Sequence, residues 1–181
     1  MDKFEKGLGM VLRNAWRHVE ALQTTDIPLL LEHISTVLQD AVGAPERLEA
    51  FEKGGDLQDR QEVMVLHYLH GVCAQVWNGE VPEDRIMPIM QTNGTFGTLV
   101  AFLGLHWSKL QAADLQLAAE ALAYICDSED FQTYEEQYAT ASDMETLGLL
   151  YASFLESMAA DGDQRRKLRP LLDFVQRSQY K

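Results

Sequence analysis

The chain has 181 residues, of which 46% are apolar and 24% are charged. This composition is typical of a folded domain with a buried core and excludes an intrinsically disordered chain. Acidic residues outnumber basic residues by 28 to 15, so the formal net charge is −13. A surface with this charge disfavours binding to free nucleic acid and to anionic membranes, because both attract basic proteins.

The first quarter of the chain carries apolar residues at spacings of three and four, the pattern of amphipathic helices. We expect helices at about 4–22, 27–42 and 45–51. The threonine and aspartate side chains at 24–26 are suited to begin the second helix, since their oxygens accept hydrogen bonds from free backbone N–H groups.

The most apolar segment is predicted to form a central helix at about 56–78. Its apolar residues cover two adjoining stripes, which indicates packing on more than one side. We expect Leu66, Leu69, Cys73 and Trp77 to lie in the core. The residues expected to face water along this helix are Glu62, His67, Gly71, Gln75 and Asn78.

The next segment contains Pro88, which predicts a short or kinked helix at 85–91 because proline lacks a backbone N–H group. Gly94 lies in a run of polar residues that predicts a turn at 92–95. Further helices are expected at about 99–110, 113–126, 128–138 and 142–158.

The start of the helix at 142–158 is marked by Ser142 and Glu145, which have the spacing of a capping box. In that motif each side chain satisfies a free backbone N–H group of the other residue. Gly162 is expected to close this helix, and a last helix should follow it with Pro170 near its start.

Strand patterns are nearly absent, so the predicted fold is all-α: a compact multi-helix bundle of about seven to eight helices. We expect a single domain over 1–181, in which 164–181 forms a basic C-terminal helix. No stretch reaches the ~18 uninterrupted apolar residues of a membrane span, and the first residues are too charged for a signal peptide. The two cysteines have no CxxC spacing, and we expect reduced thiols and a cytoplasmic protein.

Charge is distributed unevenly along the chain. Residues 111–163 contain twelve acidic and no basic residues, whereas 164–181 contain six basic residues and a single aspartate. The acidic residues predicted to bind a partner are Asp127, Glu129, Asp130, Glu135, Glu136, Asp143 and Glu145. The basic residues of the tail are Arg165, Arg166, Lys167 and Arg169, followed by Arg177 and Lys181.

The basic tail must pair either with the chain's own acidic helices or with an anionic partner. Its apolar residues need cover from water; they are Leu168, Leu171, Leu172 and Val175. We therefore expect the tail to pack within the molecule, near Glu129, Asp130, Glu135 and Glu136.

Candidate chemistry is sparse. His67, His70 and Cys73 are metal-ligand types, but on a helix His67 and Cys73 point roughly 120° apart, so the three do not converge on one ion. No nucleophile elbow or phosphate-binding loop is present. We predict no catalytic residue, no metal site, no cofactor and no enzymatic activity.

The leading hypothesis is a non-enzymatic acidic helical protein that docks a basic protein or the cationic groove of a larger assembly. An inhibitor, an immunity protein, a chaperone and a nucleic-acid mimic all fit this description. One alternative is a small ribonucleoprotein subunit that contacts nucleic acid only through its basic tail. Another is a metal-binding or enzymatic protein that uses His67, His70 or Cys73.

Overall fold

The computed structural model describes residues 27–43 and 61–179, and these residues form helices and turns without any strand. The predicted all-α bundle is therefore confirmed for the described part of the chain. Its helices are α2 (Ile27–Gly43), α4 (Gln61–Trp77), α5 (Glu83–Asn93), α6 (Thr95–His106), the 3-10 turn η3 (Trp107–Lys109), α7 (Ala112–Asp127), α8 (Glu129–Thr133), α9 (Glu135–Tyr138), α10 (Ala141–Leu150), the π-helical turn η4 (Tyr151–Leu155), α11 (Glu156–Met158) and α12 (Gly162–Gln179).

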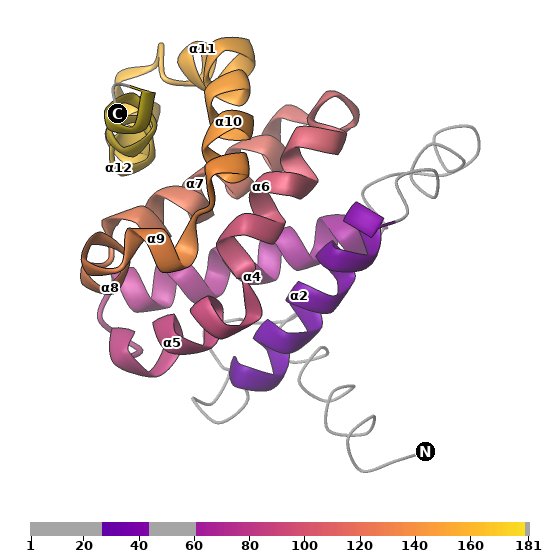
Figure 1. Cartoon of the computed structure of the whole chain (residues 1–181), viewed down its shortest axis with the longest axis vertical. Coiled ribbons are helices and arrows are strands. Elements are labelled where there is room, and N and C mark those ends of the chain that lie inside the picture. Colours follow the sequence, from indigo (N-terminus) through magenta and orange to yellow (C-terminus); the bar gives the residue numbers. More distant parts are fainter. Residues whose placement is uncertain (1–26, 44–60, 180–181) are drawn as a thin grey trace.

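Four helices that are distant in sequence pack in series through the molecule. Helix α2 lies against α4, α4 lies against α7, and α7 lies against α12, so α4 and α7 are both central (Figure 1). The predicted helices at 4–22 and 45–51, and the capping residues at 24–26, lie outside the described residues. Within the described ranges no helix has the length and apolar character to cross a membrane.

Helix α4 has the predicted core residues Leu66, Leu69 and Cys73 fully or nearly buried. Three other expectations for this helix are wrong. Glu62 and Gln75, predicted to face water, are buried, whereas Trp77, predicted to lie in the core, is 54% exposed. Trp77 is the last residue of α4, where the helix meets the turn that leads to α5. Periodicity gives the direction of a side chain but not the point at which the neighbouring helices stop covering it.

The turn at 92–95 is confirmed as the junction of α5 and α6. Gly94 has φ of 64° and ends α5 in the left-handed conformation, which glycine adopts without a Cβ clash. Pro88 lies inside α5 and does not end it, while Met87 and Met90 on either side of it are buried. The helix spans only 83–93 and is therefore short, as predicted.

An aromatic cluster fixes two short helices, α8 and α9, against the bundle. The ring of Phe131 in α8 lies 5.1 Å from Phe96 in α6, 4.9 Å from Phe174 in α12 and 5.3 Å from Tyr138 in α9, measured between centroids. Ser128 caps α8 by accepting a hydrogen bond from the backbone N–H of Phe131. These contacts anchor the acidic segment 128–138 to α6 and α12.

The helix predicted at 142–158 is divided into α10, η4 and α11. Its capping box is not the predicted Ser142–Glu145 pair: Thr140 is the N-cap, its hydroxyl accepts from the N–H of Asp143, and Asp143 accepts from the N–H of Thr140. Both pairs have the same spacing along the chain, two residues apart, and in the observed box the acidic partner is an aspartate. Helix α10 packs on α6.

Helix α12 confirms a basic C-terminal helix but not its predicted beginning. It begins at Gly162, which was expected only to close the preceding helix, and Pro170 lies in its middle. Proline removes one backbone hydrogen bond from the middle of α12. The helix keeps its place because its apolar face is buried against the bundle. Leu168, Leu171 and Val175 on that face are buried against the bundle.

Candidate functional site

The basic tail is docked on the molecule's own acidic helices, as predicted. Lys167 lies 3.6 Å from Glu120 of α7, and Arg177 donates to Glu135 of α9 at 2.9 Å. The other pairs lie within the tail segment itself: Arg166 with Asp163 at 2.7 Å and Arg169 with Asp173 at 3.8 Å. All four basic side chains are more than half exposed, so burial of the apolar face contributes more to docking than these pairs do.

Four of the seven predicted partner-binding acids are partly buried, and three of these have partners inside the fold. Asp130 accepts from the Tyr138 hydroxyl, Glu135 binds Arg177, and Asp143 belongs to the capping box of α10. Asp127, the fourth, lines a cavity described below. The tail was expected to lie near Glu129, Asp130, Glu135 and Glu136. Of these four, only Glu135 pairs with a described residue of the tail, Arg177.

The other three acids are free on the surface. Glu129, Glu136 and Glu145 are exposed, and none of them has a side-chain partner among the described residues. They belong to α8, α9 and α10, which follow one another along the chain (Figure 1). We call these three residues the free acidic face.

The histidines of α4 are held by buried carboxylates of α7. Nε2 of His67 lies 3.2 Å from Asp114 Oδ1, and Nε2 of His70 lies 2.8 Å from Glu120 Oε2. The two bonds point to different carboxylates, and no cluster of three or more potential metal ligands occurs among the described residues. His106 is buried in the core, with Nε2 3.3 Å from the Ala41 carbonyl.

Glu120 is the junction of three helices. Its buried carboxylate is contacted by His70 of α4, by Lys167 of α12 and by Gln116 of its own helix. Burying a carboxylate is unfavourable unless it is hydrogen-bonded or paired, and here it has three partners. We assign Glu120 a structural role: it sets the positions of α4 and α12 on either side of α7.

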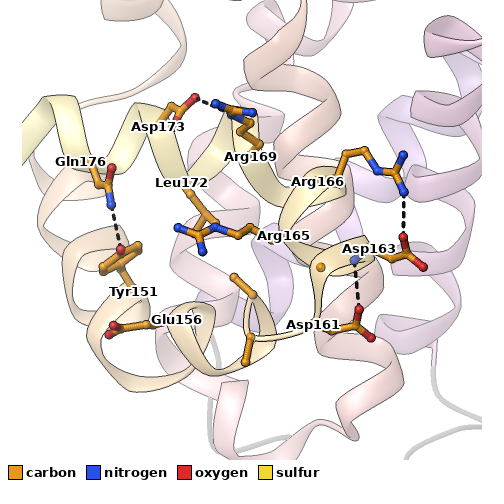
Figure 2. Close-up of a pocket in the computed structure, with 13 residues that line it drawn as sticks. Tyr151, Glu156, Asp161, Asp163, Arg165, Arg166, Arg169, Leu172, Asp173 and Gln176 are labelled. Carbon is orange, nitrogen blue, oxygen red and sulfur yellow. Dashed lines mark hydrogen bonds and ion pairs between the residues drawn. The ribbon is translucent and has the colours of Figure 1, made fainter.

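An open hollow of about 950 Å³ lies between α12 and the η4–α11 segment (Figure 2). The Gln176 amide bonds the Tyr151 hydroxyl at 2.9 Å on one side, and Arg165 points across the hollow. Glu156 lies opposite, so the walls carry both signs of charge. Tyr151 begins the π-helical turn, a distortion that is frequent near functional sites.

A second concave region surrounds the exposed Trp77. Its ring lies 5.7 Å from the Tyr124 ring of α7. On the α12 side Trp77 lines two open hollows of about 600 and 560 Å³, both bordered by Arg166. On the α5 side it lines a cavity of about 180 Å³ whose polar wall contains Glu83 and Asp127.

The buried thiols offer no nucleophile. Burial raises the pKa of Cys73 to about 12, and burial also raises the pKa of Cys126. A thiol needs to lose its proton to attack, so both remain inert at neutral pH. Cys73 also has no histidine base to itself, because His70 is bonded to Glu120.

Sequence reasoning missed Asp114, Glu120, Glu83 and Tyr124. A signal for the first two was present: Asp114 and Glu120 lie six residues apart in an alanine-rich helix, and His67 and His70 are a helical pair in the most apolar one. Their pairing depends on how α4 crosses α7, which the pattern of one helix does not encode. Family models, curated proteins and solved structures were each compared with the chain, and none of them matches it.

Proposed function

We propose that the protein is a non-enzymatic binding protein whose acidic surface docks a basic protein or the cationic groove of a larger assembly. Inhibitors, immunity proteins, chaperones and nucleic-acid mimics share this mode of recognition. We place it in the cytoplasm as part of the same proposal, with the two unpaired, buried cysteines as support. The whole chain is proposed to act as one domain.

The observation that supports the proposal is that some acidic side chains have partners inside the fold, whereas others are exposed and have none among the described residues. The basic tail takes up Glu120 and Glu135, and internal hydrogen bonds take up Asp130 and Asp143. Glu129, Glu136 and Glu145 remain exposed in a segment that has no basic residue to neutralise them. Such a field steers a positively charged protein toward the surface and repels nucleic acid.

A second candidate function rests on Arg165. Its side chain points into the 950 Å³ hollow and has no acidic partner among the described residues (Figure 2). A ribonucleoprotein subunit would use such a residue to contact a phosphate. We rank this candidate lower because Glu156, Asp161 and Asp163 line the same hollow and repel phosphate.

The test is affinity capture with the full chain from the host cell, after nuclease treatment, at low and high salt. The variant combines Glu129→Lys with Glu136→Lys. Its matched control combines Glu32→Lys with Asp40→Lys, which changes the net charge equally on exposed positions of α2. We expect one basic protein to be captured at low salt, to be released at high salt, and to be lost only with the first variant.

Two results contradict the proposal. Equal loss with both double variants would mean that total charge, and not this face, determines capture. Recovery of RNA that disappears in Arg165→Gln would transfer the function to the tail and favour the ribonucleoprotein subunit.

A further inference from the structure

Trp77 is an unusual residue to leave in water at the end of a central helix. Tryptophan and tyrosine are enriched among the residues that contribute most to protein interfaces. Here Trp77 and Tyr124 stand side by side, with ring centroids 5.7 Å apart and planes inclined by 44°. The pair therefore presents an aromatic wall, and Trp77 is 54% exposed at its outer edge.

The cavity on the α5 side of this wall, which we call the Trp77 cavity, has three kinds of lining. Trp77 and Tyr124 form the aromatic wall, and Glu83 and Asp127 supply two carboxylates. The remainder is apolar apart from Ser128 and is formed by Cys73, Val76, Met87, Met90, Ile125 and Ser128. Among the described residues, no lysine, arginine or histidine lines it.

The volume of the Trp77 cavity limits what enters it. At about 180 Å³ it holds roughly six water molecules at their share of liquid volume. A drug-sized ligand needs a pocket of about 300 Å³ or more. The side chain of a lysine or an arginine has about as many heavy atoms as six water molecules and therefore fills a similar volume. The cavity therefore matches a single side chain of a larger partner.

The electrostatics of the cavity favour a cation. Burial raises the pKa of Asp127, and the neighbouring charge of Glu83 raises it further. The ionised form of Asp127 is therefore disfavoured beside this apolar wall, and a positive charge placed next to it would relieve that cost. An ammonium or guanidinium group also gains attraction from the face of an adjacent tryptophan or tyrosine ring.

The basic residues that border this wall on the α12 side lie in a different hollow. Arg166 and Lys167 line the 600 Å³ hollow that shares Trp77, Tyr124 and Asp127 with the cavity. Both are already paired, Arg166 with Asp163 and Lys167 with Glu120. They border the site on one side and do not fill it.

We propose that the Trp77 cavity receives the cationic end of a lysine or arginine side chain of the basic partner, held between the Trp77–Tyr124 wall and the carboxylates of Glu83 and Asp127. This inference rests on the proposed function and adds to it a defined point of contact. The free acidic face supplies attraction over a distance, and the Trp77 cavity supplies the buried contact that fixes the partner's position.

The probe is a pair of capped pentapeptides, Gly-Gly-Lys-Gly-Gly and the same peptide with uncharged norleucine in place of lysine. The full chain is labelled with ¹⁵N, and the indole N–H signal of Trp77 is identified by its absence in Trp77→Leu. We expect the lysine peptide to shift this signal in a saturable manner and the norleucine peptide to leave it in place. An arginine peptide should act as the lysine peptide does.

Asp127→Asn should weaken the lysine peptide by roughly threefold or more, the effect of one partly exposed ion pair. Tyr134→Leu, which removes another exposed aromatic residue outside the cavity, should leave binding unchanged. Thermal melts of each variant confirm that it is folded, and the exposure of Trp77 leads us to expect a normal melt for Trp77→Leu.

Equal binding of the lysine and norleucine peptides would overturn the inference, because the cavity would then be merely apolar. An unshifted Trp77 signal at saturating lysine peptide would also overturn it. Neither result affects the proposed function, which is tested separately by salt-sensitive capture of a partner through Glu129 and Glu136. A third outcome is that the lysine peptide binds at Trp77 while the Glu129→Lys, Glu136→Lys variant captures the partner as the unmodified chain does. That result would support the Trp77 cavity as a binding site and would contradict the role of the free acidic face.

Discussion

Truncation of Leu168 tests whether burial or charge holds α12 in place. Leu168 is 0% exposed on the face of α12 that packs against the bundle. Leu168→Ala should cost about 2–5 kcal/mol, from the lost transfer of the side chain and from the cavity left behind. At about 2–4 °C per kcal/mol for a chain of this size, the melting temperature should fall by about 4–20 °C.

Two comparisons isolate the cause. Leu149→Ala makes the same chemical change at a residue that is 67% exposed, and it should cost less than about 0.5 kcal/mol. Arg177→Ala removes the 2.9 Å ion pair with Glu135 and should cost about 0–1 kcal/mol, because the arginine is 59% exposed. Urea denaturation followed by circular dichroism measures all three. Equal losses in Leu168→Ala and Arg177→Ala would refute the reasoning and make the ion pairs the main support of α12.

Three further predictions follow from the buried groups. Cys73 and Cys126 should resist a thiol reagent at pH 8 in the native protein and react fully in urea. The reason is that a pKa of about 12 in place of 9.0 lowers the thiolate fraction of Cys73 roughly 1000-fold. Rapid labelling of the native protein would contradict this prediction. Asp127→Asn should raise the free energy of unfolding at pH 7, because a carboxyl group whose pKa is raised in the folded state costs stability when it is ionised. The gain should shrink as the pH falls through that raised pKa. A lower free energy of unfolding at pH 7 would contradict the prediction. Elemental analysis should find less than one metal ion per chain, because His67 and His70 bond separate carboxylates; one ion per chain that disappears in His70→Ala would be evidence against that assignment.

The sequence predicted the helices well because each amphipathic helix carries its own repeat. The burial of Leu66 and Leu69, the turn at Gly94, and the apolar face of the tail all follow from spacings within one segment. Trp77 is the instructive failure. It shares a stripe with Leu66 and Cys73, but it lies at the end of α4, where the covering helices leave it half exposed.

The candidate sites were less predictable because they depend on contacts between helices. The acidic segment was visible as a run of charge, but the pattern did not indicate that Asp143 would enter a capping box or that Asp130 would bond Tyr138. The Trp77 cavity combines residues of α4, α5 and α7, and the distance from Glu83 to Asp127 along the chain is too large for a local motif. Only the packing of these three helices brings its carboxylates beside its aromatic rings.

The central claim is that the free acidic face attracts a basic partner, and titration of the full chain with octalysine tests it most directly. The titration should be run at low and high salt, beside a single-stranded RNA oligonucleotide. We predict that octalysine binds, that salt weakens it by screening, and that Glu129→Lys with Glu136→Lys weakens it more than Glu32→Lys with Asp40→Lys does. RNA should not bind. Binding of RNA, or equal weakening of octalysine by the two double variants, would contradict the claim.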